Sequence, residues 1–215
     1  TAAMIKYQTL PDMLDDRARG EGAIVYLEGE GAEKTLKLTD LRRRALGILF
    51  HLQRIGAKPG DHLILHVASN EQFIDAYWAC LYGGIIPVPV AVGISDEHKQ
   101  KLLRIAKQLG NPLLYTDRKL RERLATFAAT QGEPEAWTAL KPRTFLVDQL
   151  DDISREGTPA RITAAQTAFI QFSSGSTSEP KGVVLTHGNI LANAEGARQG
   201  AAFCEQDTSL SWMPL

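Results

Sequence analysis

Hydroxyl side chains, glycine and one lysine lie close together in residues 173–182, whose sequence is SSGSTSEPKG. In a turn of this composition the backbone N–H groups point into a concave anion site, the hydroxyls add hydrogen-bond donors, and the lysine adds a point charge. These residue types and this spacing predict a phosphate-binding loop. A nucleoside triphosphate is the ligand that such a loop suits.

The Walker A loop, the best-known phosphate loop, is excluded by two residues. Counting from Gly175, Pro180 stands where that pattern has its second glycine, and Gly182 stands where it has the metal-binding hydroxyl. The apolar residues 183–185 predict a strand after the loop rather than a helix, so we expect the loop to join two strands. A polar surface hairpin without a ligand is the alternative, which the rigid Pro180 beside the cation Lys181 disfavours.

Residues 174–182 resemble the signature loop of the adenylate-forming superfamily, whose pattern is roughly Ser/Thr-Ser-Gly-Ser/Thr-Thr-Gly-x-Pro-Lys-Gly. This superfamily comprises acyl-CoA synthetases, fatty acyl-AMP ligases, luciferase-like enzymes and the adenylation domains of nonribosomal peptide synthetases. The one fixed position that differs is Ser178, where the family usually has glycine. If that position needs a positive φ angle, the serine strains the loop.

The resemblance implies that ATP is bound and that a defined set of residues holds its phosphates. Ser174, Ser176, Thr177 and Lys181 are expected to bind the β- and γ-phosphates, which leave as pyrophosphate. Mg²⁺ is expected with the triphosphate, but no residue of this sequence is assigned as a metal ligand or as a catalytic group. The residues expected to contact the nucleotide are Ser173, Ser174, Gly175, Ser176, Thr177, Ser178, Lys181 and Gly182.

The reaction that the resemblance implies is an AMP-forming acyl ligation in two steps. A carboxylate attacks the α-phosphate of ATP to give an acyl-adenylate, and a thiol then takes the acyl group. Residues 169–174 (FIQFSS) and 212–215 (WMPL) look most like fatty acyl-AMP ligases, so we expect a fatty acid as substrate and an acyl carrier protein as the thiol acceptor. The alternatives are an acyl-CoA or aryl-CoA ligase, with CoA as acceptor, and a nonribosomal peptide adenylation domain. A non-catalytic binding or scaffold module is the alternative of another class.

Several parts of the family pattern do not occur in these 215 residues: the adenine- and ribose-binding motifs, the metal carboxylate and the C-terminal domain with its catalytic lysine. We therefore expect the chain to be the N-terminal part of a larger enzyme and to be inactive alone. His187 follows the loop in the sequence, after the expected strand. Thr186 and His187 stand between this strand and the next expected helix, which favours a structural role, because both side chains can satisfy free helix N–H groups.

Strand and helix signals alternate along the chain, which predicts a parallel sheet with helices on both faces. The expected fold class is α/β, a mostly parallel sheet flanked by helices, and the resemblance implies part of the N-terminal domain of the adenylate-forming fold. We expect residues 1–160 to form an α/β subdomain with an N-terminal hairpin, and residues 161–215 to begin the next subdomain, which carries the loop. The expected strands before the loop are 23–27, 34–38, 63–67, 85–90, 113–115, 144–147 and 168–172.

Local signals add detail to this arrangement. Pro87 and Pro89 remove backbone donors, which predicts that the strand they occupy is an edge or ends there. Thr39 is expected to cap the helix that follows it. Residues 131–142 are expected to form a polar connection, and residues 151–159 a charged linker.

Composition and charge exclude several classes of function. A formal net charge of −1 gives no electrostatic reason to bind nucleic acid or an anionic membrane, and residues 42–44, three arginines, are expected to spread over a solvated helix face. Cys80 and Cys204 lack the spacing of a zinc site or a disulfide framework and fit a reducing cytoplasm. The longest apolar run is too short for membrane insertion.

Overall fold

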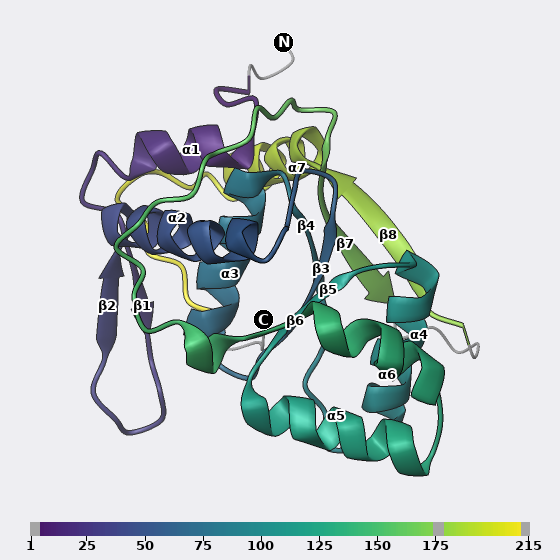
Figure 1. The fold of residues 1–215 in the computed structure, drawn as a ribbon. Coiled ribbons are helices and arrows are strands. Elements are labelled where there is room, and N and C mark those ends of the chain that lie inside the picture. Colours follow the sequence, from purple (N-terminus) through teal and green to yellow (C-terminus); the bar gives the residue numbers. More distant parts are fainter. Residues whose placement is uncertain (1–4, 174–178, 212–215) are drawn as a thin grey trace.

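A computed structural model of the chain describes residues 5–173 and 179–211 (Figure 1). In this part of the chain a four-stranded parallel sheet is accompanied by two antiparallel hairpins. The strands are β1 (Ala23–Tyr26), β2 (Lys34–Lys37), β3 (His62–His66), β4 (Ile86–Pro89), β5 (Leu113–Thr116), β6 (Thr144–Leu146), β7 (Thr167–Ser173) and β8 (Lys181–Thr186). The helices are α1 (Leu10–Arg17), α2 (Leu38–Arg54), α3 (Asn70–Gly83), α4 (Asp96–Leu109), α5 (Arg118–Thr130), α6 (Pro134–Leu140) and α7 (His187–Gly200), with short 3-10 turns at Lys141–Arg143 and Val147–Gln149.

The main sheet has the strand order β4–β3–β5–β6, and each neighbouring pair is parallel. Successive side chains of a strand point to opposite faces; one face packs with α2 and α3, the other with α4, α5 and α6 (Figure 1). The main-sheet strand residues buried on the α2–α3 face are Leu63, Leu65, Leu113, Tyr115 and Phe145. Those buried on the opposite face are Ile64, Val88 and Leu114. The expected α/β class, with helices on both faces of a parallel sheet, is confirmed.

β4 is an edge strand of the main sheet, as its two prolines predict. The amides of Ile86 and Val90 donate toward β3 and its preceding turn, at 2.8 and 3.0 Å. Because donors alternate along a parallel strand, the nitrogens of Pro87 and Pro89 face away from β3 and carry no hydrogen. β7 contacts β4, yet the two strands belong to different sheets, since these positions offer no backbone donor.

Most of the expected elements are present, and the differences have local causes. β1 and β2 form the expected antiparallel hairpin, and Asp117 caps α5 by accepting a hydrogen bond from the backbone N–H of Leu120 (2.7 Å). The predicted cap at Thr39 is wrong, because α2 begins at Leu38, directly after β2. Lys37 takes the cap position without a side-chain hydrogen bond, and Thr39 lies inside the first turn.

The expected polar connection at residues 131–142 is wrong in part, because it contains the helix α6. Pro134 occupies the first turn of this helix, where the N–H that proline lacks would have no intrahelical partner. Trp137 and Leu140, three residues apart, are buried in the same hydrophobic cluster as residues of α4 and α5. A short amphipathic helix therefore forms where the composition indicated only a connection.

The charged segment after β6 lies against α2. The backbone N–H of Gly157 donates to the carbonyl oxygen of Leu46 (2.8 Å). Gln53 exchanges two hydrogen bonds with the backbone of Thr158, both at 2.9 Å. These hydrogen bonds attach the linker to α2. The expected division between subdomains near residue 160 remains a prediction.

The three arginines of residues 42–44 do not form a cationic patch, because each has a carboxylate partner. The pairs are Arg42 with Asp15, Arg43 with Asp40 and Arg44 with Asp75. Both cysteines are free thiols, Cys80 buried and Cys204 exposed. No helix within residues 5–173 and 179–211 is long and apolar enough to cross a membrane.

Candidate functional site

The β7–β8 hairpin holds the two ends of the predicted loop side by side. Its strands pair antiparallel, with Phe172 opposite Gly182 and Ser173 opposite Lys181, which confirms that the loop joins two strands. β7 alternates between its faces, and its buried residues Ile170 and Phe172 belong to the hydrophobic cluster that contains residues of α4 and α5. The hairpin is thereby fixed to the core, and the loop is presented at its end.

The structure describes three of the residues that were predicted to contact a nucleotide. Ser173, Lys181 and Gly182 lie together at the end of the hairpin, and all three are exposed. The other predicted residues, Ser174, Gly175, Ser176, Thr177 and Ser178, lie outside the described residues.

A close approach between the strands explains the glycine at position 182. A Cβ atom added to Gly182 would lie 3.1 Å from Cγ2 of Ile170 and 3.1 Å from ring atoms of Phe172. The φ angle of Gly182 is not among the positive ones, so the need is for space rather than for backbone freedom. A side chain here would press on the residues that anchor the hairpin.

Lys181 places an exposed positive charge beside the loop. No carboxylate among the described residues lies within ion-pair distance of its ammonium group. The same part of the chain contains no group of His, Cys, Asp or Glu side chains that could hold a metal ion. This end of the hairpin therefore fits an anion such as a phosphate.

One residue that the sequence did not indicate contacts the second limb of the loop. The side-chain amide of Gln108, on α4, donates to the carbonyl oxygen of Pro180 (3.1 Å) and to Oε2 of Glu179 (3.3 Å). Gln108 is exposed and belongs to no motif. A polar residue on the outer face of a helix gives no sequence signal for such a contact.

His187 occupies a structural position at the start of α7. Its ring is buried, and Nδ1 accepts a hydrogen bond from the backbone N–H of Leu10 (3.1 Å). Burial lowers the pKa of His187, against a smaller opposing effect of Asp12, which favours the neutral ring that an accepting nitrogen requires. Thr186 caps the helix in a capping box with Asn189. These contacts account for the Thr-His pair without a catalytic role.

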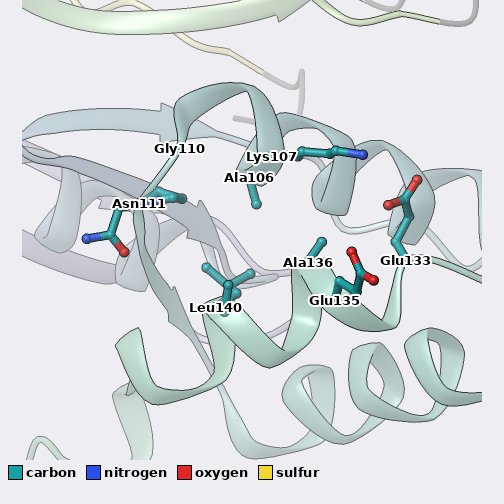
Figure 2. A pocket seen from close by; sticks show the side chains of 10 residues that line it. Ala106, Lys107, Gly110, Asn111, Glu133, Glu135, Ala136 and Leu140 are labelled. Carbon is teal, nitrogen blue, oxygen red and sulfur yellow. The ribbon is translucent and has the colours of Figure 1, made fainter.

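A cavity of about 230 Å³ lies between the last turn of α4 and α6 (Figure 2). Its polar lining includes Lys107 together with the carboxylates of Glu133 and Glu135, so its charge disfavours a polyphosphate. The lining residues are Ala106, Lys107, Gly110, Asn111, Pro112, Glu133, Glu135, Ala136, Ala139 and Leu140. We therefore place the candidate site at the hairpin and not in this cavity.

Comparisons with known proteins agree with the loop and the fold. The family model described as "AMP-binding enzyme" matches residues 14–215. The long-chain-fatty-acid–AMP ligase FadD26 of Mycobacterium marinum is 27% identical, over 97% of this chain and 37% of its own length.

Two solved structures share the fold closely. McyG A-PCP, complexed with phenylalanyl-adenylate, has a TM-score of 0.86 and 33% identity, covering 99% of this chain and 38% of that one. A fatty acid AMP ligase from Legionella pneumophila has a TM-score of 0.82 and 27% identity, covering 97% of this chain and 36% of that one. The chain thus spans less than two fifths of the length of these relatives.

The family assignment rests on most of the chain rather than on the loop alone. The match begins in α1 and includes the main sheet, the β7–β8 hairpin and α7. Because the family model matches residues 14–215, this chain belongs to the family of AMP-binding enzymes.

Proposed function

We propose that this chain is the phosphate-holding part of an ATP-dependent ligase that converts a carboxylic acid, in the first place a fatty acid, into an acyl-adenylate. The enzyme then passes the acyl group to the thiol of a carrier protein. The observation that carries the proposal is the paired end of the β7–β8 hairpin, where the exposed Lys181 and Ser173 stand opposite each other beside the signature loop.

In the first step an oxygen of the substrate carboxylate attacks the α-phosphorus of ATP. The new bond joins that oxygen to phosphorus, the bond to the β-phosphate oxygen breaks, and pyrophosphate leaves. Lys181 would neutralise charge on the β- and γ-phosphates, while Ser173 and the loop residues Ser174, Ser176 and Thr177 would donate hydrogen bonds. A bound Mg²⁺ would share this neutralisation.

In the second step a thiolate sulfur attacks the acyl carbon, and AMP leaves with the electron pair of the broken carbon–oxygen bond. The remaining proposed nucleotide contacts are Gly175, Ser178 and Gly182, and the two glycines would let the backbone approach the phosphates. We place the enzyme in the cytoplasm, and we regard residues 161–215 as the start of a second subdomain that carries the loop.

Exchange of radiolabelled pyrophosphate into ATP tests the first step. The product of the complete reading frame would be incubated with Mg·ATP and a panel of fatty, aryl and amino acids. We expect exchange that depends on a fatty acid. Multiple-turnover release of inorganic phosphate without pyrophosphate would contradict adenylate formation.

The acceptor is tested separately, by supplying a phosphopantetheinylated carrier protein or CoA after adenylate formation. We expect acyl transfer to the carrier protein and not to CoA. The reverse result would identify the enzyme as an acyl-CoA or aryl-CoA ligase.

A second candidate substrate class follows from the structural comparison. McyG A-PCP, solved with phenylalanyl-adenylate, is 33% identical to this chain, against 27% for the Legionella fatty acid AMP ligase. An amino acid or aryl acid, activated as in a nonribosomal peptide adenylation domain, is therefore the runner-up, and the same exchange panel distinguishes it.

A scaffold that keeps the fold without the activity is the alternative of another class. Calorimetry with Mg·ATP on the wild type and on Lys181→Ala separates it from a ligase. Heat of binding that the substitution removes supports the phosphate site, whereas no heat from either protein favours the scaffold.

A further inference from the structure

α4 shares a buried hydrophobic cluster with the hairpin and also contacts its tip. Along the body of the hairpin, Ile170 and Phe172 of β7 share a buried cluster with Leu102 and Ile105 of α4. At the tip, Gln108 on the last turn of α4 donates its two hydrogen bonds to Glu179 and Pro180. The contact joins residues that are 71 and 72 positions apart in the sequence.

The bond to Pro180 acts on the backbone next to Lys181. A peptide unit is planar, so the carbonyl group of Pro180 and the nitrogen and Cα of Lys181 lie in one plane. The proline ring also restricts φ of Pro180. Holding this carbonyl oxygen at 3.1 Å from the amide of Gln108 therefore limits how the plane can turn. Since Lys181 also pairs with Ser173 in the ladder, its Cα is held from both sides.

The hydrogen bond to Glu179 affects where the negative charge of this carboxylate lies. The Glu179 carboxylate is two residues from Lys181 and has the opposite sign, so it could neutralise the lysine or repel a phosphate. Gln108 instead holds Oε2 of Glu179 at 3.3 Å on the α4 side. Within the described residues Glu179 and Lys181 form no ion pair. A glutamine amide has two N–H donors, so both bonds can exist at once.

We propose that Gln108 is a positioning residue: it fixes the second limb of the loop so that Lys181 faces the phosphates of ATP and keeps its charge. The inference rests on the proposed function for its consequence and on the two hydrogen bonds for its geometry. Gln108 touches neither substrate nor reacting atoms in this scheme and acts through Lys181.

Two measurements on the product of the complete reading frame test the proposal. Hydrogen–deuterium exchange of the amides of residues 181–184 reports the anchor itself, independently of activity. Pyrophosphate exchange at varied Mg·ATP and varied carboxylic acid reports its consequence. The variants are Gln108→Ala, Gln108→Glu, the double variant Gln108→Glu with Glu179→Gln, and the control Lys107→Ala, which changes the neighbouring exposed residue of α4.

Gln108→Ala removes both hydrogen bonds, of which the neutral one to Pro180 acts on the backbone. We expect it to speed amide exchange and to raise the KM for Mg·ATP, each by about fivefold, the change that one neutral hydrogen bond supports. The KM for the carboxylic acid should not move. Gln108→Glu should have a larger effect, because its carboxylate faces two acceptors and one of them is charged. The double variant restores a donor at position 179 and should recover part of the loss, while Lys107→Ala should match the wild type in both measurements.

The two hypotheses fail in different ways. If the wild type shows no pyrophosphate exchange, the proposed function is contradicted. If the amides of residues 181–184 nevertheless exchange faster with deuterium in Gln108→Ala than in the wild type, the anchoring role of Gln108 still holds. A wild-type protein that is active, with Gln108→Ala unchanged in amide exchange and in the KM for Mg·ATP, overturns the role of Gln108. Equal increases in the KM for Mg·ATP and for the carboxylic acid, without recovery in the double variant, would also overturn the role of Gln108, because they indicate a general structural defect.

Discussion

Two adjacent residues, Lys181 and Gly182, have different physical roles at the tip of the hairpin. Lys181 is exposed and has no carboxylate partner among the described residues. A Cβ atom on Gly182 would lie 3.1 Å from Ile170 and Phe172, so these neighbours would have to shift to accept a methyl group. Substitutions at the two positions should therefore separate charge from packing.

Lys181→Ala removes charge without disturbing the hairpin. We expect pyrophosphate exchange to fall by about 10²-fold, the usual loss when one preorganised stabilising group is removed. The unfolding midpoint in urea should not change. Lys119→Ala, which removes an exposed lysine on α5, is the matched control and should keep full exchange activity. A Lys181→Ala protein with undiminished exchange would show that this ammonium group does not hold the phosphates.

Gly182→Ala adds a methyl group where the Cβ meets neighbours at 3.1 Å. We expect a loss of about 1–3 kcal/mol in the free energy of unfolding, the usual cost of overpacking. Gly196→Ala is the control: this glycine lies in α7 with nothing within 4 Å, and the substitution should stabilise by about 0.5–1 kcal/mol. Denaturant unfolding of both variants measures the contrast, and equal stability changes would contradict the packing argument.

Lys181 and Gly182 could be predicted from the sequence because their neighbours in the chain define the loop. Gln108 could not, since it meets the loop through residues more than 70 positions away and looks like any other polar residue on a helix surface. The signature predicts which residues contact the ligand, but not which residues elsewhere in the chain contact the loop.

At the scale of elements, periodicity predicted the strands of the main sheet and the long helices, because burial on one or both faces leaves a clear apolar pattern. The prolines of β4 also predicted its place at an edge. α6 was missed because its apolar pattern consists of two residues, Trp137 and Leu140, in a polar segment that begins at a proline. Short elements depend on tertiary packing, which a local pattern does not contain.

The contact between α2 and α3 includes a polar pair that the sequence did not indicate. Arg44 donates to Oδ2 of Asp75 from Nε (2.9 Å) and from Nη2 (2.7 Å). The side chain of Asp75 is only 3% exposed, and its other oxygen has no partner among the described residues. The carboxylate therefore depends on this arginine.

Arg44→Met should lower the free energy of unfolding by about 3 kcal/mol, the low end for breaking a buried pair, since Arg44 itself is 33% exposed. Arg43→Met is the control. Arg43 pairs with Asp40 only at the surface, at 3.5 Å, so the loss of this pair should change the free energy of unfolding by no more than about 0.5 kcal/mol. Urea unfolding curves decide the matter, and similar midpoints for the two variants would contradict a special role for Arg44.

At the scale of the molecule, helices from the two ends of the chain pack against each other. α1 and α7 lie side by side (Figure 1), and Leu10 and Leu191 belong to one hydrophobic cluster. The bond between Leu10 and His187 joins residues 177 positions apart. No local signal predicts such a contact, and the sequence offered only the Thr-His pair at one end of it.

This bond should make stability depend on pH. Nδ1 of His187 accepts from Leu10 only while the ring is neutral, and burial lowers the pKa of His187 in the folded state below its value in the unfolded chain. Above a pH of about 6.5 the ring is neutral in both states and the contribution is complete. As the pH falls below that value, the unfolded chain takes up the proton first, so the stability contribution decreases until the folded ring is protonated as well.

His62 and His66 also have pKa values lowered by burial, so the wild type alone cannot isolate His187. We would compare unfolding free energies between pH 8 and pH 5 for the wild type and for His187→Asn. His187→Asn should lose less stability on acidification than the wild type, even if it is less stable at pH 8. If the two proteins lose stability equally on acidification, then the link between α1 and α7 does not titrate through His187.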